Sequence, residues 1–248
     1  MAALAVFLLV RDARRGWSAR VLPVAVIYAA TMICFVIANK TTTAANAIFL
    51  QAAAPAYLLL LSPWLLKEKV FRSDIVTLIV IGIGLALVFG DLPAASSTAP
   101  NPKLGNLMGL LSGVTWAFTM IGMRWLGRAE GGDQSTLATT VAGNLIACLF
   151  CLPFALPVSG DATDWAMILY LGVFQIGLAY VLLSRGIAGV PALEASLILY
   201  IEPALNPVWA WMFHDERPGV MVIAGGALIL LATLARSFLR RPPSAPAT

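Results

Sequence analysis

The chain has 248 residues, of which 60% are hydrophobic and only 11% are charged, with a formal net charge of +4. A soluble domain carries about 45–50% apolar and about 25% charged residues, so this composition excludes an ordinary soluble protein, and the basic residues, spread over short loops, do not indicate a nucleic-acid partner. The apolar residues form runs of about 20, the length that a helix needs to cross a bilayer. The sequence therefore predicts an all-α polytopic membrane protein.

The first apolar stretch, residues 1–10, would be only about 15 Å long as a helix, half of a hydrocarbon core of about 30 Å. Basic residues follow it, which is the reverse of a secretory signal. We expect the end of a spanning helix whose beginning is absent. Further helices are expected at residues 19–38, 41–66, 73–90, 104–126, 133–157, 164–184, 190–213 and 219–239. The tail 241–248 has three prolines and is expected to be disordered.

Lys and Arg are distributed unequally between alternate loops, and an excess of them marks the cytoplasmic side. One side has only Lys40, Lys103 and Arg217. The other side has the remaining thirteen: Arg11, Arg14, Arg15, Arg20, Lys67, Lys69, Arg72, Arg124, Arg128, Arg185, Arg236, Arg240 and Arg241. The sequence therefore predicts a multi-pass protein of the inner (plasma) membrane with a cytoplasmic C-terminus.

An internal duplication appears when the chain is shifted by 148 residues. The shift places residues 44–68 on 192–216 with 5 identities in 25, including Pro55 on Pro203 and Glu68 on Glu216. The two copies share a mid-helix proline followed 13 residues later by a glutamate at the helix end. Five helices, an odd number, separate equivalent points, so the copies are expected to face opposite ways through the membrane. Inverted repeats of this kind are common in secondary transporters.

The same shift predicts an inverted repeat of five plus five helices, with the first helix and part of the second absent from this chain. We expect a first, incomplete transmembrane repeat at residues 1–90 and a second at residues 104–240. A mis-started reading frame would explain the missing part, and an upstream apolar run would support that hypothesis.

Two segments resemble the signature helices of the EamA family of the drug/metabolite transporter superfamily. They are "AANAIFLQAAAPAYLLLLSPWLLKEK" (Ala44 to Lys69) and "ASLILYIEPALNPVWAWMFHDERPG" (Ala195 to Gly219). Both have a small-residue start, a central proline, and a terminal glutamate followed by Lys or Arg. The resemblance implies ten helices in an inverted repeat around a central cavity, and export of metabolites, amino acids or drugs. The family is broad, so the resemblance does not indicate the substrate.

Glu194 and Glu202 are the acidic residues expected within helices. A charge at the bilayer centre costs about 2.5–3.5 kcal/mol on insertion scales, so such a residue is first considered functional. Glu194 is within a turn of the cytoplasmic end, whereas Glu202 is expected near the midplane. Two interpretations of Glu202 stay open: it binds substrate or a coupling proton in the cavity, or it is a hydrogen-bonded carboxyl that supports the helix around Pro203.

Further mid-helix polar and aromatic residues are candidates for the cavity lining, because pockets place a few such groups among apolar ones. Together with Glu202 the candidates are Asn206, Gln51, Trp116, Gln175 and Tyr180. The alternative for each is an interhelical hydrogen bond, worth about 0.6 kcal/mol on average in membranes. We interpret four residues as structural or gating elements of the two repeats: Pro55, Glu68, Pro203 and Glu216.

A ridge of small residues, Gly105, Gly109, Gly113 and Ala117, predicts that another helix approaches this one closely. The CxxC pair, Cys148 and Cys151, has no second pair and no nearby histidine, so neither a metal site nor a cofactor is predicted.

An enzyme is not predicted, because motifs such as HExxH, GxSxG and the P-loop are absent from the sequence. Without a P-loop, transport would be secondary. The expected partners are therefore a small-molecule substrate, the bilayer and, under one interpretation of Glu202, a proton. Two alternatives to an exporter stay open: a non-transporting receptor or assembly subunit on the same scaffold, and an inactive truncated chain.

Overall fold

The computed structural model describes residues 6–8, 10–65, 71–90, 96–97, 99–127, 132–157, 160–179, 182, 201–214 and 217–239. These residues are helical or form turns and connections, and none of them lies in a β-strand, so the all-helical prediction is confirmed for them. They belong to two compact units, residues 1–33 with 115–190 and residues 34–114 with 191–248.

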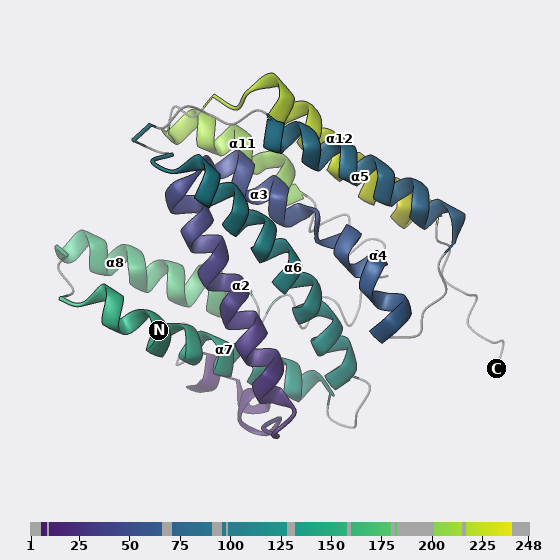
Figure 1. The fold of residues 1–248 in the computed structure, drawn as a ribbon. Helices are drawn as coiled ribbons and strands as arrows, with labels where there is room; N and C mark the ends of the chain where they lie inside the picture. Colours follow the sequence, from purple (N-terminus) through teal and green to yellow (C-terminus); the bar gives the residue numbers. More distant parts are fainter. Residues whose placement is uncertain are drawn as a thin grey trace, which may run out of the picture. The chain divides into compact units, whose positions relative to one another are not determined.

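Figure 1 shows the helices, coloured in chain order. They are η1 (Arg11–Arg14), α2 (Val21–Thr41), α3 (Ala44–Ala52), α4 (Ala54–Leu65), α5 (Arg72–Gly90), α6 (Pro102–Gly127), α7 (Gly132–Ala155), α8 (Ala162–Tyr170), the π-helical segment η2 (Leu171–Leu178), α11 (Ile201–His214) and α12 (Val220–Leu239).

Four helices within the described residues are long and apolar enough to cross a membrane. They cover Val21–Thr41, Arg72–Gly90, Pro102–Met123 and Gln134–Ala155. Shorter apolar helices cover Ala162–Leu178 and Val220–Arg236. These lengths agree with a chain that crosses the bilayer several times.

The helix expected at 41–66 is wrong as a single element, because the structure divides it at Ala53 into α3 and α4. Pro55 has no amide hydrogen to donate to the Gln51 carbonyl, and its ring would collide with that carbonyl in a continuous helix. Instead the Ala53 amide donates to the Gln51 oxygen, and the amide of Ala56 donates to the oxygen of Ala53. The proline therefore starts a new helix.

The helix expected at 164–184 also differs from the structure. Its first part is α8, which begins at a capping box in which Asp161 and Asp164 bond to each other's backbone amides. The chain then continues as η2, a π-helix with i to i+5 hydrogen bonds. Such helices are rare and often occur at functional sites. The helix expected at 190–213 is described only from Ile201 onward, as α11.

In the first unit, α2, α7 and the second half of α6 share a buried cluster that includes Val24, Leu126 and Ala138. A Cβ on Gly143 of α7 would lie 2.4 Å from Cδ1 of Tyr28, so the ring packs directly on the α7 backbone. Thr31 and Thr119 join α2 to α6 through a buried hydroxyl contact of 3.3 Å. Small residues and short polar contacts therefore hold these helices together.

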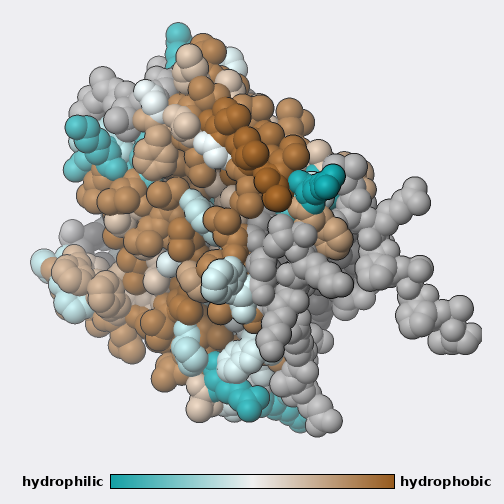
Figure 2. Space-filling view, turned by 45° about the vertical axis from the view of Figure 1, so that its right-hand side comes forward, coloured by the Kyte–Doolittle hydropathy of each residue, from teal (hydrophilic) through white to brown (hydrophobic). Residues whose placement is uncertain are grey.

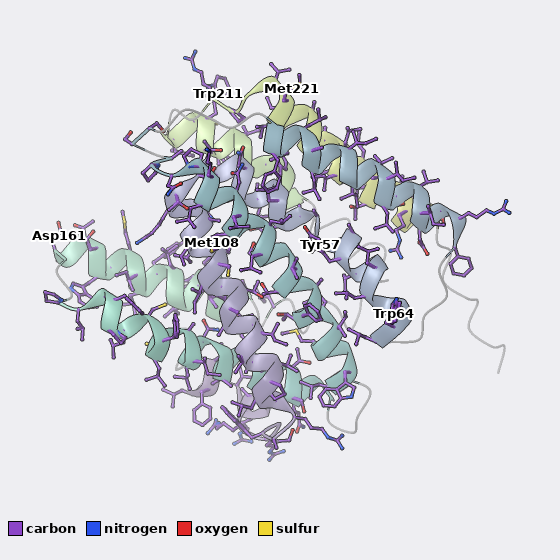
Figure 3. All side chains as sticks on the ribbon, viewed as in Figure 1. Tyr57, Trp64, Met108, Asp161, Trp211 and Met221 are labelled. Carbon is purple, nitrogen blue, oxygen red and sulfur yellow. The ribbon has the colours of Figure 1, made fainter. Side chains whose placement is uncertain are left out.

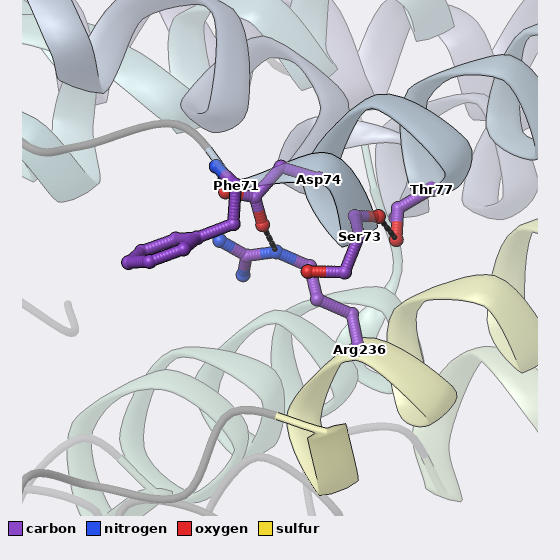
Figure 4. A network of polar contacts seen from close by, with 5 residues as sticks. All are labelled: Phe71, Ser73, Asp74, Thr77 and Arg236. Atoms are coloured by element: carbon purple, nitrogen blue, oxygen red, sulfur yellow. Dashed lines mark hydrogen bonds and ion pairs between the residues drawn. The ribbon is translucent and has the colours of Figure 1, made fainter.

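In the second unit, α5 and α12 pack along their length as an antiparallel pair (Figure 1). At one end, Nε of Arg236 donates to Oδ1 of Asp74 at 3.0 Å (Figure 4). In the middle, Ile81 and Ile229 are fully buried in one cluster, and at the other end Val88 and Val222 share a second cluster. Among the described residues, the line of contact between α5 and α12 (the seam) thus combines this charged contact with apolar clusters, and Thr77 and Thr233 are also buried on the two helices.

The seam is narrow because two glycines face each other across it. A Cβ on Gly84 would lie 2.7 Å from the Gly225 oxygen, and a Cβ on Gly225 would lie 2.5 Å from the Gly84 oxygen. Both distances are shorter than a real Cβ allows, so the two backbones are in direct contact.

The glycine ridge of α6 is confirmed in this unit. A Cβ on Gly105 would lie 2.5 Å from Thr42, on Gly109 it would lie 3.2 Å from Leu50, and on Gly113 it would lie 2.9 Å from the Leu50 oxygen. The ridge therefore brings the first half of α6 against the end of α2 and against α3.

Hydrophobic side chains cover most of the described surface on the face drawn in Figure 2. Exposed apolar residues occur on α5, α7, α11 and α12, among them Ile79, Leu149, Phe213 and Leu231. A soluble protein seldom exposes apolar patches larger than a few hundred Å², whereas lipid contact requires such a surface.

Candidate functional site

The polar candidates of the second unit lie on α3 and α11, which pack against each other. Nδ2 of Asn206 donates to the carbonyl oxygen of Ala44 at 3.1 Å, so this side chain joins the middle of α11 to the first turn of α3. Gln51 is half-buried near the end of α3, seven residues farther along. The structure thus brings Asn206 to α3 but places Gln51 about 10 Å along the helix from that contact.

Glu202 lies in the first described turn of α11 and is exposed. Its side chain shares a helical face with Asn206 and Trp209, and Trp209 is also exposed and stacks on Phe213 with ring centroids 6.0 Å apart. An exposed carboxylate beside a hydrogen-bonding amide can take up a cation, an amine or a proton, so both interpretations of Glu202 stay open.

The candidates of the first unit are placed differently. Trp116 is half-buried in α6, whereas Gln175 is exposed in the π-helical segment η2. Tyr180 lies outside the described residues. The π-helical turn around Gln175 is of a kind often found at functional sites, and it is a feature that the sequence did not indicate.

Of the gating candidates, Pro55 lies in the first turn of α4, directly after the break at Ala53, and Pro203 lies in the first described turn of α11. Glu68 and Glu216 lie outside the described residues.

Tyr57 is a polar residue that the sequence analysis missed. Its hydroxyl is buried and has no hydrogen-bond partner among the described residues. It lies on α4 (Figure 3), and a Cβ on Gly113 of α6 would be 3.2 Å from its ring and 3.4 Å from Cα of Gln51. A buried hydroxyl without a hydrogen-bond partner is costly, so the Tyr57 hydroxyl could form a hydrogen bond with a polar group of a ligand. A single phenol two residues after Pro55, directly before four leucines, was the available signal.

A second missed feature is a buried polar cluster where α2, α3 and α6 meet. Oδ1 of Asn106 accepts from the Thr42 hydroxyl at 2.8 Å and from Nδ2 of Asn46 at 3.1 Å. All three side chains are at most 1% exposed. Nδ2 of Asn106 has no partner within the described part of the chain. The cluster fixes the chain entering α3 and thereby the position of Gln51.

A pocket of about 700 Å³ opens between α3, α11 and α12, and its described lining includes none of the predicted cavity residues. Among the described residues, its lining is apolar except for one cation; these residues are Phe49, Val208, Trp211, Arg217, Pro218, Ile223, Ala227 and Leu230. On α11, Val208 and Trp211 lie on the face opposite Glu202. The pocket is therefore suited to an apolar molecule with an acidic end.

Metal-binding clusters of three or more His, Cys, Asp or Glu side chains are absent from the described residues. Cys148 and Cys151 lie exposed on the last turns of α7 as free cysteines.

Comparison with known proteins gives several similar chains. The pseudopaline exporter CntI of Pseudomonas aeruginosa (strain UCBPP-PA14) is 26% identical over 239 residues, which are 94% of this chain and 81% of that protein. An uncharacterized transporter of Archaeoglobus fulgidus is 26% identical over 205 residues, covering 82% of this chain and 71% of that protein. A solved crystal structure shares the fold with a TM-score of 0.60 at 18% identity, covering 96% of this chain and 83% of that one.

The model of the EamA-like transporter family matches residues 1–90 and 103–237, nearly the whole chain. This match agrees with the membrane-length helices and with relatives that are transporters rather than enzymes. The chain therefore belongs to the EamA-like transporter family and is a multi-pass membrane transporter.

Proposed function

We propose that this transporter is a secondary exporter of small organic molecules, such as metabolites, amino acids or drugs, and that it works by alternating access between two inverted repeats. The proposal further places the C-terminus in the cytoplasm and the protein in the inner membrane, on the basis of the Lys and Arg distribution.

The observation that carries the proposal is the pairing of α5 with α12. The shift of 148 residues that relates the repeats carries Ile81 onto Ile229, and these two residues share one buried cluster. The same shift carries Asp74 onto Val222 and Val88 onto Arg236. It thus exchanges the ion pair at one end of the seam with the valine contact at the other.

A two-fold axis through Ile81 and Ile229, perpendicular to the seam, would produce this exchange. Two helices related by such an axis run antiparallel, as α5 and α12 do. Because an axis in the membrane plane relates inverted repeats, the internal symmetry of this pair supports the five-plus-five architecture.

Export is supported by the relative named as an exporter, although 26% identity does not carry its substrate to this chain. We assign the polar contacts with substrate to Gln51, Asn206 and Glu202 in one unit and to Trp116 and Gln175 in the other. Tyr180 stays a candidate on sequence grounds. Pro55 follows the break at Ala53, and we assign Pro203 the equivalent role in the second repeat, with Glu68 and Glu216 at the ends of the two segments.

The test is transport into or out of vesicles that contain the purified chain, with a panel of amino acids, metabolites and cationic dyes. A solute that moves only in vesicles with protein supports the proposal, and a panel that gives no protein-dependent flux in either direction contradicts it.

Once a solute is found, Glu202→Gln is compared with Glu194→Gln, the same change near the cytoplasmic end. If Glu202 carries the coupling proton, only its variant loses the pH dependence of transport. If the flux and pH profile of Glu202→Gln equal those of the parent, Glu202 has the supporting role instead.

A further inference from the structure

The pocket between α3, α11 and α12 extends along α12, from Arg217 at its polar end to the apolar Leu230. Arg217 and Pro218 lie between the end of α11 and the start of α12, where the chain leaves the apolar region. From Val220, the first residue of α12, to Leu230, the deepest residue in the lining, the helix rises about 15 Å. This is half of a hydrocarbon core of about 30 Å. The pocket therefore extends from a membrane surface to about the midplane.

The side chains that line the pocket are those expected at this depth of a bilayer. Ile223, Ala227 and Leu230 are spaced at 4 and 3 residues and form one stripe on α12, and Val208 and Trp211 form a matching stripe on α11. Trp211 lies near the end of α11 toward Met221 and the start of α12 (Figure 3). The tryptophan thus lies at the level where indole rings favour the lipid headgroups.

The pocket is also open to its surroundings. Val208 is 44% exposed, Trp211 55% and Ile223 51%. A cavity that carries a transported solute is expected near the midplane between the repeats, whereas the described lining of this one comes from a single unit and begins at a membrane surface.

From this arrangement we propose that the pocket is a binding site for one anionic phospholipid, whose phosphate contacts Arg217 and whose acyl chain lies between α11 and α12 against Phe49. The length of one leaflet, the apolar stripes and Arg217, the cation of the described lining at the surface end, all fit this ligand. The site is independent of the transported substrate, because it requires only that the protein lies in a membrane.

The Lys and Arg distribution places Arg217 on the side with few basic residues. A cation near the surface strengthens binding of an anionic lipid about fivefold. Phe49 connects the site to the rest of the unit, since its ring touches Gly226 of α12: a Cβ on that glycine would lie 2.4 Å from the ring. An occupied site would therefore support the packing of α3 against α12.

The test uses full-length protein in vesicles of phosphatidylcholine that contain a small fraction of phosphatidylglycerol. Either lipid carries brominated acyl chains, which quench a nearby tryptophan. Trp211→Phe defines the part of the fluorescence that comes from Trp211. Brominated phosphatidylglycerol is expected to quench this part at mole fractions about fivefold lower than brominated phosphatidylcholine does.

Arg217→Gln is expected to abolish this preference, and Arg217→Lys to restore most of it. Asp215 and Glu216, the acidic neighbours of Arg217, lie outside the described residues. Their effect on lipid binding is the same in the Gln and Lys variants, so the difference between these variants reports the charge at position 217.

A second pair of variants tests the acyl-chain part. Ala227→Trp fills the pocket, whereas Ala224→Trp places the same side chain at an exposed position of α12 that does not line it. Only Ala227→Trp is expected to reduce the phosphatidylglycerol that native mass spectrometry finds on the protein. Equal quenching by both lipids, or equal loss with both tryptophan variants, would overturn the proposal. Competition by a transported acidic solute would also overturn it and identify a substrate site.

Discussion

Individual glycines determine how closely the helices of this transporter approach one another. Gly105 is the most constrained glycine of the α6 ridge, because a Cβ there would lie 2.5 Å from both the backbone nitrogen and Cβ of Thr42. We expect Gly105→Ala to lower the free energy of unfolding by about 1–3 kcal/mol, the usual cost of overpacking. The thermal midpoint in detergent measures this loss.

Gly82 on α5 is the matched control, since a Cβ there would meet nothing within 4 Å. Gly82→Ala should keep the midpoint or raise it, because alanine favours a helix by up to about 1 kcal/mol over glycine. Equal midpoints for the two variants would contradict the close approach of α6 to Thr42.

The ion pair of Asp74 and Arg236 supplies a second prediction for single residues. The carboxylate side chain is 2% exposed and the Arg236 side chain 21%, and Asp74 also accepts from the amide of Phe71 at 2.9 Å (Figure 4). Arg236→Val leaves the buried charge of Asp74 without this partner. The free energy of unfolding should fall by close to the lower end of the roughly 3–5 kcal/mol typical of broken buried pairs.

The double variant Asp74→Val with Arg236→Val should be more stable than the sum of the single changes predicts, because it removes both charges. Unfolding in SDS for the four members of the cycle measures the coupling. Strictly additive losses would show that the pair contributes nothing specific.

The sequence revealed some of these residues and not others. The α6 ridge follows from the spacing of Gly105, Gly109 and Gly113 in one helix. The contact of Gly84 with Gly225 does not, because isolated glycines in separate helices carry no information about which helices meet. The buried Tyr57 hydroxyl was missed for a similar reason: its isolation depends on the neighbours of α4.

At the scale of the element, the division of α3 from α4 follows from Pro55. We expect Pro55→Ala to let the helix run on through Ala53 and to leave folding intact, since alanine removes a local conflict rather than a contact. Transport should fall by roughly tenfold, the equivalent of 1.4 kcal/mol in the barrier, if the break allows α4 to move.

Initial rates in vesicles, normalised to the amount of folded protein, measure this effect. Pro153, the proline near the end of α7, is the control, because Pro153→Ala alters a helix end rather than a break between two helices. A Pro55→Ala variant that transports as fast as its parent would remove the role of the break.

Helix positions were largely predictable from apolar runs, and α5 and α12 agree with their expected ranges within a few residues. The π-helical segment η2 was not predictable, because its residues, from Leu171 to Leu178, are as apolar as those of an ordinary helix. Composition alone therefore does not distinguish it from an α-helix.

At the scale of the whole molecule, the inverted repeat makes a prediction about topology. Cysteines introduced in place of Lys69 and Arg217 should lie on opposite sides of the membrane, with position 69 in the cytoplasm. In a background without Cys34, Cys148 and Cys151, an impermeant maleimide should label position 217 in intact cells and position 69 only after permeabilisation. Labelling of both positions from one side would contradict the inverted arrangement.

Composition alone was sufficient to predict a polytopic membrane protein, and the signature segments were sufficient for the family. The lipid-facing pocket was not predictable, because its stripes on α11 and α12 look like ordinary lipid-facing surface until the two helices and Phe49 are placed together.

The seam between α5 and α12 joins two helices of nearly equal length, yet its ends differ in chemistry. One end holds Asp74 and Arg236, and the other holds Val88 and Val222. Dissolved salt screens a partly buried ionic contact less than an exposed one, but it does not screen an apolar contact at all. Only the compartment at the end with Asp74 and Arg236 can therefore affect the packing of α5 and α12 through its salt concentration. Two halves of the same structure would then respond differently to the two sides of the membrane.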